Sequence, residues 1–303
     1  MAEKLPSYGG QALIEGVLMR GSKSLAAAMR KPDGEIVIET ELLTGIYTNP
    51  LVKTPFIRGL VLLWDSLGIG MHYLTVSANL QTGEDEKLEG PVLYLTLAAS
   101  LAIGIGIFFL APAGIGHLAM NYLGWSSWWS NVLEGVLRLI FAIGYIWGIG
   151  KMPDIARVFA YHGAEHKTIN AFEAGAEMTP ESVSKYSLEH PRCGTAFLLT
   201  LIILSVIVFA FLGPLPGVWR YVIRLLLIFP LASLAYEIIR FSSNHLSNPL
   251  VQIIVKPNMA LQRLTTREPS LEMLEVSITA FQTMLVQEQS QIAKTIQLAH
   301  ETA

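Results

Sequence analysis

Four apolar segments, each about twenty residues long, constrain the fold of this chain more than any other feature. They lie at 91–112 and 131–150 and, as a pair, within 195–241. A helix of that length crosses a hydrocarbon core of about 30 Å, and it satisfies its own backbone hydrogen bonds there. Only 15% of the 303 residues are charged, against about 25% in soluble domains. We therefore expect a mainly α-helical membrane protein with about four transmembrane helices.

A fifth apolar segment, at 54–80, carries a narrow polar seam. Arg58, Asp65, His72 and Asn79 recur every seven residues, so they lie along one stripe of a helix. The segment could be a further span or a helix lying in the membrane interface. The stripe favours a packing face or a contact between copies of the chain, so a homo-oligomer formed through this seam or through the C-terminal helices is one expectation.

Lys and Arg avoid two of the connections between the apolar segments. The stretches 113–130 and 213–217 contain none, whereas basic residues occur before 90, within 151–194 and after 241. Because basic residues mark the cytoplasmic side, we expect a multi-pass protein with both termini and the central loop in the cytoplasm. If 54–80 also crossed, this charge pattern would be violated. We therefore interpret 54–80 as an interfacial or re-entrant helix.

The polar parts of the chain lie at its two ends and in its centre. Residues 1–53 form an N-terminal region in which 26–40 reads as a β-hairpin, with its turn at Pro32-Asp33-Gly34. Residues 242–303 form a cytoplasmic C-terminal helical region, with helical apolar spacing from 270 to 300. The net charge of −3 argues against nucleic acid as a partner, which leaves the lipid bilayer as the expected one.

The central region, 151–194, contains the strongest chemical motif. His162 and His166 are four residues apart with Glu165 beside them, in the pattern H-x-x-E-H. A helix predicted from Pro153 to about residue 174 puts these side chains on one face together with Asn170 and Glu173. Two imidazoles on one helical face are typical of a divalent metal site, and zinc is the metal that we expect.

The same region offers further ligands and polar groups. His190 and Cys193 form an H-x-x-C pair that is compatible with zinc, and Cys193 is the single cysteine of the chain. Glu165, or alternatively Glu173, would be the general base beside the metal. Under the predicted topology, several other polar side chains would emerge at the same membrane face. These candidates are Arg157, Asn170, Arg192, Glu237 and His245.

Three functions remain open from the residues alone. The first is a metal-dependent hydrolase working at the cytoplasmic membrane face. The second is a non-catalytic oligomeric scaffold, or a protein that recruits partners, with at most a structural metal. The third is a channel or transporter, indicated only by Glu134 and Arg138 within an apolar segment. We interpret that pair first as a structural ion pair between helices.

Five strings of the sequence form a specific set: GGQALIEGVLMRG at 9–21, RVFAYHGAEHK at 157–167, HPRCGT at 190–195, YEIIR at 236–240 and LQRLTTREP at 261–269. Together they resemble the bacterial domain-of-unknown-function family 1385, described as predicted metal-dependent membrane enzymes. The resemblance covers nearly the whole chain. It implies a bacterial multi-pass protein of the inner (plasma) membrane.

Overall fold

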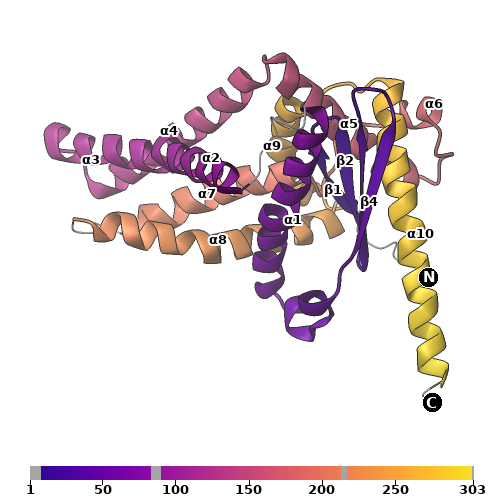
Figure 1. Ribbon diagram of the computed structural model, residues 1–303. Coiled ribbons are helices and arrows are strands. Elements are labelled where there is room, and N and C mark those ends of the chain that lie inside the picture. The colour runs from indigo at the N-terminus through magenta and orange to yellow at the C-terminus, as the bar shows by residue number, and fades with distance from the viewer. Residues whose placement is uncertain (1–7, 83–89, 213–216, 302–303) are drawn as a thin grey trace.

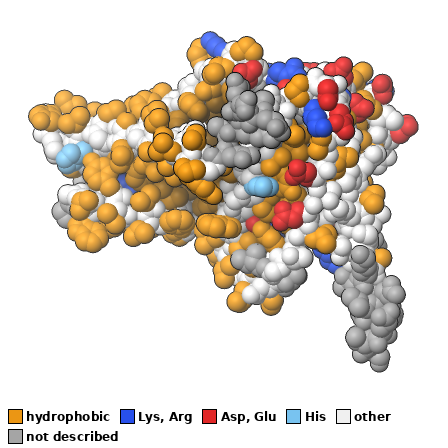
Figure 2. Space-filling view, in the orientation of Figure 1, with side chains coloured by type: hydrophobic (Ala, Val, Ile, Leu, Met, Phe, Trp, Pro, Cys, Tyr) orange, Lys and Arg blue, Asp and Glu red, His pale blue; other side chains and the backbone are white. Residues whose placement is uncertain are grey.

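A computed structural model describes residues 8–82, 90–212 and 217–301 of the chain. Figure 1 shows two parts: a bundle of long helices and, at one end of it, a β-sheet flanked by helices. In the space-filling view, hydrophobic side chains cover the bundle, and charged side chains gather over the end that holds the sheet (Figure 2). This division of the surface suits a protein that associates with a membrane through its bundle.

The N-terminal sheet is a four-stranded antiparallel meander. Its strands are β1 (Gly9–Leu13), β2 (Gly16–Arg20), β3 (Ser24–Arg30) and β4 (Ile36–Leu42), in that spatial order. The predicted hairpin is confirmed as β3 and β4, where Arg30 pairs with Ile36 across the turn. Gly34 occupies that turn with φ +92°, a backbone conformation that glycine adopts without steric cost.

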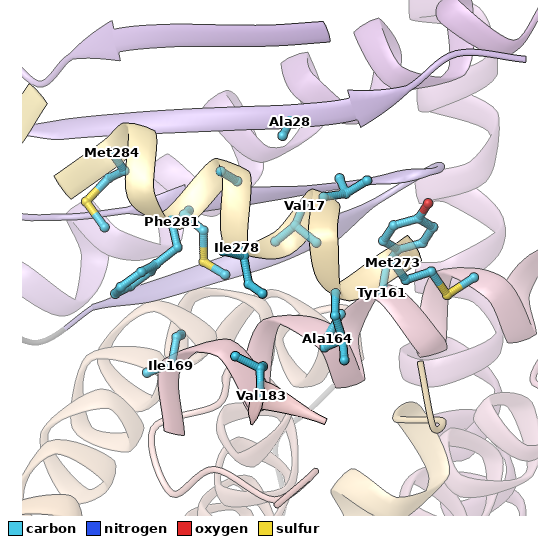
Figure 3. Packing of buried hydrophobic residues seen from close by; sticks show 14 of the residues in the cluster. Val17, Ala28, Tyr161, Ala164, Ile169, Val183, Met273, Ile278, Phe281 and Met284 are labelled. Carbon is cyan, nitrogen blue, oxygen red and sulfur yellow. The ribbon is translucent and has the colours of Figure 1, made fainter. Parts of the chain in front are cut away.

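Both faces of the two central strands are buried, which explains their uninterrupted apolar sequences. One face packs against helices α5 (Pro153–Glu173) and α10 (Leu271–Glu301), and it contributes Val17, Met19, Ala26 and Ala28 (Figure 3). The opposite face packs against helix α1 (Ile57–Gln81), and it contributes Leu18, Leu25, Ala27 and Met29. The sheet is therefore the middle layer of three.

Five helices are long and apolar enough to cross a membrane. They are α1 (Ile57–Gln81), the continuous helix formed by α2 (Gly90–Ile105), a π-helical turn (Gly106–Leu110) and α3 (Ala111–Leu123), then α4 (Ser127–Ile149), α7 (Gly194–Phe211) and α8 (Trp219–Asn244). In Figure 1, α1 runs across the direction of the other four, beside the sheet.

One expected loop is a helix. The first apolar segment was expected to end at residue 112, but α3 continues to Leu123. Pro112 has no N–H for the carbonyl of Phe108, and the π-helical turn just before Ala111 adjusts the backbone there. Arg138 Nε donates to that carbonyl oxygen at 3.1 Å, so the helix passes through Pro112 without leaving Phe108 O unsatisfied.

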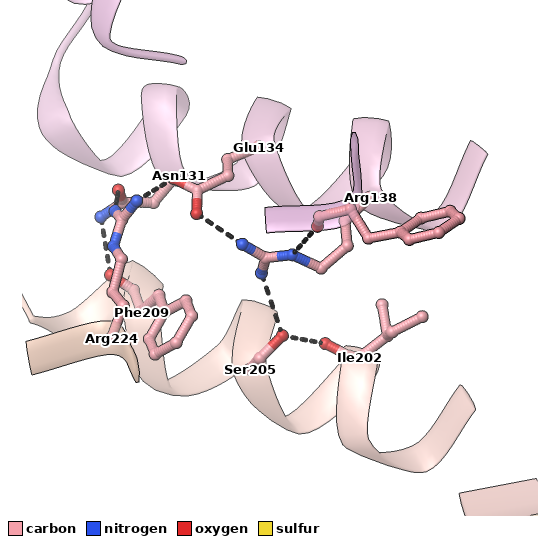
Figure 4. Close-up of polar contacts among 8 residues, drawn as sticks. Asn131, Glu134, Arg138, Ile202, Ser205, Phe209 and Arg224 are labelled. Carbon is pink, nitrogen blue, oxygen red and sulfur yellow. Dashed lines mark hydrogen bonds and ion pairs between the residues drawn. The ribbon is translucent and has the colours of Figure 1, made fainter. Parts of the chain in front are cut away.

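A buried ionic network joins three helices of the bundle (Figure 4). Glu134 on α4 accepts hydrogen bonds from Arg138, at 2.8 Å, and from Arg224 of α8. Arg138 also donates to Ser205 of α7 at 3.3 Å. The predicted pair of Glu134 and Arg138 is confirmed, and its further contacts support the structural interpretation, since paired buried charges hold neighbouring helices in register.

The remaining elements surround the sheet end of the bundle. They are two short 3₁₀ turns, Gly45–Thr48 and Pro50–Lys53, and the helices α5 (Pro153–Glu173), α6 (Pro180–Val183), α9 (Pro249–Thr265) and α10 (Leu271–Glu301). The helix predicted from Pro153 is confirmed as α5. It packs on β1 and α10, which fixes the face that carries the H-x-x-E-H motif.

Candidate metal centre

The two histidines of the motif lie side by side on α5. The helix begins with Pro153 at its first turn and ends before Gly175, whose φ of +71° terminates it. His162 and His166 are one turn apart, and their ring centroids are 4.4 Å apart. His166 is almost fully buried. The helical spacing therefore produces the juxtaposition that the sequence predicts.

Each of these imidazoles is oriented by a backbone carbonyl. His162 Nδ1 lies 2.9 Å from Thr265 O, and His166 Nδ1 lies 2.5 Å from Leu188 O. A carbonyl only accepts hydrogen bonds, so each Nδ1 is the protonated nitrogen and each Nε2 keeps its lone pair. Metal-binding histidines are commonly held by such a bond from the second ring nitrogen.

The lone pairs converge on the single cysteine. His162 Nε2 is 3.2 Å from Cys193 Sγ, and His166 Nε2 is buried with no hydrogen-bond partner. Within the described residues, the ligand atoms of His162, His166 and Cys193 all lie within 4.8 Å of one another. Two nitrogens and one sulfur at this separation match the donor set that zinc takes in proteins.

Cys193 occupies the N-cap position of α7, where the chain enters a candidate membrane helix. Its sulfur accepts a hydrogen bond from Thr195 N at 3.4 Å. An N-cap side chain points back over the first turn. The position of Cys193 at the start of α7 thus sets the direction of its sulfur.

His190, the other candidate third ligand, faces a different partner. Its Nε2 lies 3.8 Å from Glu173 Oε2 and 3.4 Å from Arg192 Nη2. Its ring centroid is 5.8 Å from that of His166. Burial lowers the pKa of His190 and so favours the neutral ring, whereas the nearby Glu165 acts in the opposite direction. The structure therefore groups Cys193, rather than His190, with the two histidines of α5.

Glu165 is buried beside this cluster, on the side of β1. Burial raises the pKa of Glu165. The nearby His162 and His190 and a hydrogen bond from the backbone of Gly10 lower it, but burial has the larger effect. A Cβ atom at Gly10 would come within 3.1 Å of Glu165 Cδ and within 2.5 Å of Leu18 O. Only glycine fits this close approach, so the N-terminal string GGQ helps to position the acid.

The other predicted polar residues support the site or lie away from it. Asn170 donates to the carbonyls of Ser187 and Glu189 and so holds the segment before His190. Glu173, a predicted alternative base, forms an ion pair with Arg192. Arg157 forms a bidentate ion pair with Glu15, in which Nε donates to Oε1 at 2.5 Å and Nη2 donates to Oε2 at 2.6 Å.

Two candidates have partners outside the cluster. Glu237 forms an ion pair with Arg58 of α1. His245 is exposed, and its Nδ1 lies 2.8 Å from the Phe241 carbonyl. Neither residue belongs to the group around Cys193.

Several residues that position the cluster were not predicted. Gln262 of α9 accepts from His190 N at 3.0 Å and donates to His190 O at 2.8 Å. Gly163 lets α5 approach the segment after α9, because a Cβ atom there would lie 2.1 Å from Arg267 O. The glycine inside the H-x-x-E-H motif was the available signal for this close contact.

A separate cavity of about 290 Å³ lies between β4, the first 3₁₀ turn and α1. Glu41, Tyr47, Trp64, Asp65 and His72 line it. Two residues of the polar seam therefore reach this cavity, and Asp65 forms an ion pair with Arg20 at 2.5 Å. With Arg58 bound to Glu237, the seam serves contacts within the chain.

Comparison with known proteins agrees with the resemblance carried by the motifs. Residues 54–287 match the family described as Protein of unknown function (DUF1385). The chain is 33% identical over 296 residues to the Uncharacterized protein YqhQ of Bacillus subtilis (strain 168), and the match covers 92% of each chain. No solved structure matches it. The chain belongs to the DUF1385 family of proteins of unknown function.

Proposed function

We propose that this protein is a zinc-dependent hydrolase of the bacterial inner membrane, with His162, His166 and Cys193 as its metal ligands. The single observation that carries the proposal is the buried Nε2 of His166, which has no hydrogen-bond partner among the residues that the structure describes. An unsatisfied buried polar atom is costly, and the nitrogen lies in the group formed with His162 and Cys193. A metal ion would remove that cost.

Three protein ligands favour a catalytic site over a structural one. Structural zinc sites are closed by four protein ligands, whereas catalytic sites keep one position for water or substrate. His190 is turned toward Glu173 and Arg192, so a zinc ion held by the other three side chains would keep its fourth position for water or substrate. Zinc, when bound, supplies Lewis acidity and activates water for attack on a carbonyl or phosphoryl group.

Glu165 is the general base in this proposal. Burial raises its pKa, which makes its carboxylate a better proton acceptor near neutral pH. It lies between β1 and the two histidines, and no ion pair neutralises it among the interactions of the described residues. Glu173 serves less well, because its ion pair with Arg192 stabilises the carboxylate form.

The membrane arrangement that we propose has four crossings, with α1 in the interface. The sheet packs on α5 and α10, so β4 and α5 lie on one side of the membrane. The chain must then cross an even number of times between them. Three candidates lie in that interval, and α1 is the least apolar of the five. Both termini and the site would face the cytoplasm, as the basic residues favour.

The metal content of the purified protein tests the proposal. We expect about one zinc per chain by elemental mass spectrometry in detergent, and loss of the zinc in His162→Ala/His166→Ala. His245→Ala is the matched control, since His245 is exposed and lies outside the cluster. Absence of metal from folded wild type after zinc is added back would refute the site.

Glu165→Gln separates catalysis from a structural role. We expect this variant to keep its zinc and to lose turnover of ester, amide or phosphoester probes presented in the membrane. The alternative is an oligomeric scaffold that holds a structural metal. It predicts instead that Glu165→Gln leaves the assembly unchanged, whereas His162→Ala/His166→Ala dissociates it on a sizing column.

A further inference from the structure

Helix α9 carries an exposed apolar face that the proposed reaction does not use. Leu250, Ile253 and Ile254 are 69%, 61% and 60% exposed. At 3.6 residues per turn they fall within an arc of roughly 100°. Val251 and Val255 lie on another face of the same helix and are buried. Three large exposed aliphatic side chains on one arc are unusual for a helix that faces water.

The position of α9 places this face beside the bundle. The helix begins at Pro249, shortly after α8 ends at Asn244. Ile254 lines a narrow pocket together with Ile238 and Ile239 of α8. Its exposed arc therefore continues the apolar surface of the bundle, which Figure 2 shows covered by hydrophobic side chains.

Contacts with α7 fix the helix at the same end of the bundle as the metal cluster. Asn258 of α9 donates to Thr200 Oγ1 at 3.3 Å, and Thr200 lies in the first half of α7, whose N-cap is Cys193. The ends of α7 and α8 that touch α9 are thus the ends nearest to the candidate ligands. Helix α9 also contacts α4 and α8.

The charges on α9 fit a lipid surface. The helix contains Lys256 and Arg263 and no acidic residue. Both basic residues fall on a third face, away from the exposed aliphatic arc and from the buried valines. An aliphatic arc flanked by a basic face is typical of a helix lying in the headgroup region of a membrane with anionic lipids.

The last turn of α9 holds the candidate metal centre. The carbonyl of Thr265 accepts from His162 Nδ1 at 2.9 Å, and Gln262 bonds to both backbone groups of His190. A shift of α9 along its axis would move the carbonyl that orients His162. One helix, which includes Pro257, therefore joins the exposed aliphatic arc to the carbonyl that orients a candidate ligand.

We infer that α9 lies in the boundary between lipid headgroups and acyl chains, with Leu250, Ile253 and Ile254 facing the chains. We infer further that this contact stabilises the orientation of His162. The second statement rests on the proposed metal site, and the first does not. A protein whose site is set by bilayer contact is suited to substrates that reside in the membrane.

Photo-crosslinking tests the bilayer contact. Benzoylphenylalanine replaces Ile253 in full-length protein reconstituted into nanodiscs of phosphatidylethanolamine and phosphatidylglycerol, and adducts are identified by mass spectrometry. We expect lipid adducts at this position and at Leu226, a 61% exposed residue of α8 that serves as positive control. Val286 of α10, 67% exposed, is the negative control and should give no lipid adduct.

Three outcomes would overturn the inference. Lipid adducts at Leu226 without any at Ile253 would place α9 outside the bilayer. Crosslinks from Ile253 to a second copy of the chain would make the aliphatic arc a dimer contact. Equal lipid labelling at Ile253 and Val286 would mean that exposure alone explains the adducts. None of these outcomes depends on whether the protein binds metal.

Release of zinc to a chelator tests the connection to His162. In nanodiscs, Ile253→Gln/Ile254→Gln should release zinc up to about tenfold faster than wild type. Loss of a group that orients a metal ligand typically weakens metal affinity by about 10–100-fold, and we expect the smaller effect here. Ile292→Gln, an exposed position on α10, is the control. Unchanged release from the double variant would overturn the connection. Wild type without metal would refute the proposed site and this connection, but it would leave the crosslinking result standing.

Discussion

At the scale of single residues, the buried acid Glu288 connects the last helix to the turn between β2 and β3. Its carboxylate accepts from the backbone N–H groups of Ser22 and Lys23, both at 3.0 Å, and from the Ser24 hydroxyl at 3.2 Å. Burial opposes ionisation of Glu288, but these hydrogen bonds outweigh it and lower its pKa. The ionised form is thus the one that stabilises the fold.

We predict that Glu288→Gln destabilises the protein by about 1.5–3 kcal/mol near neutral pH, the usual worth of hydrogen bonds to a charged group. Because the folded pKa is lowered, the stabilisation is present above the ordinary glutamate pKa and is lost as the pH falls through the folded value. Wild type and variant should therefore converge in acid. Thermal unfolding in detergent across pH measures this.

Glu272→Gln is the matched control, since Glu272 lies exposed in the first turn of the same helix. It should cost less than about 1 kcal/mol, the worth of an acid near a helix N-terminus. A Glu288→Gln protein that is as stable as wild type at neutral pH would contradict the assignment of Glu288 as a stabilising contact.

At the scale of elements, the approach of α5 to the segment between α9 and α10 depends on one glycine. Gly163 lies between His162 and Ala164, and an added Cβ would meet Arg267 O at 2.1 Å and Leu188 Cδ2 at 2.8 Å. Arg267 N also donates to Phe159 O at 2.9 Å. The carbonyls of Leu188 and Thr265, which orient the two histidines, therefore belong to segments packed against this glycine.

We predict that Gly163→Ala lowers the free energy of unfolding by about 1–3 kcal/mol through overpacking, despite the better helix propensity of alanine. It should also weaken zinc binding, because Thr265 O would be displaced from His162. Gly144→Ala on α4 is the control, since nothing lies within 4 Å of its added Cβ. A stable Gly163→Ala protein with full zinc content would disprove the close approach.

The elements differ in how well the sequence predicts them. Apolar runs and the turn at Gly34 follow local rules, so the long helices and the hairpin of β3 and β4 were expected. Strands β1 and β2 were not. Burial on both faces removes from β2 the alternation that marks a strand, and β1 begins with two glycines, which are uncommon in strands. Helix α3 was hidden because Pro112 suggests an end, and Arg138 supplies its missing hydrogen bond from a distant helix.

The candidate metal centre was also predicted only where it depends on local sequence spacing. The spacing of His162 and His166 needs only the periodicity of a helix, so their proximity was expected. The choice between His190 and Cys193 depends on Glu173 and Gln262, which approach from α5 and α9. Such long-range contacts leave no local pattern. Glu237 and His245 were expected near the two histidines only because the predicted topology places them on the same side of the membrane. Topology does not determine how far they lie from the histidines.

At the scale of the whole molecule, the packing of the sheet is the basis of the four crossings that we propose. It packs on α1 with one face and on α5 and α10 with the other. With α1 in the interface, Gly90 lies on the same side as α5, and Trp125, between α3 and α4, lies on the opposite side. A fifth crossing by α1 would separate the sheet from α5.

We predict the same pattern from reporter fusions in a bacterial host. Fluorescent-protein fusions that end at Gly90 and at the C-terminus should both report the cytoplasm, and a fusion at Trp125 should report the other side, where alkaline phosphatase is active instead. A fusion at Gly90 on the side opposite to the C-terminus would show that α1 crosses, and it would contradict the proposed topology.

Zinc-edge X-ray absorption of the detergent-purified protein tests whether His162, His166 and Cys193 bind zinc with one open position. We expect one sulfur ligand at about 2.3 Å and light-atom ligands at about 2.0–2.1 Å that include two imidazoles. The sulfur contribution should disappear in Cys193→Ser. A wild-type spectrum without sulfur, or one that requires three imidazoles and the thiolate, would contradict the open three-ligand site.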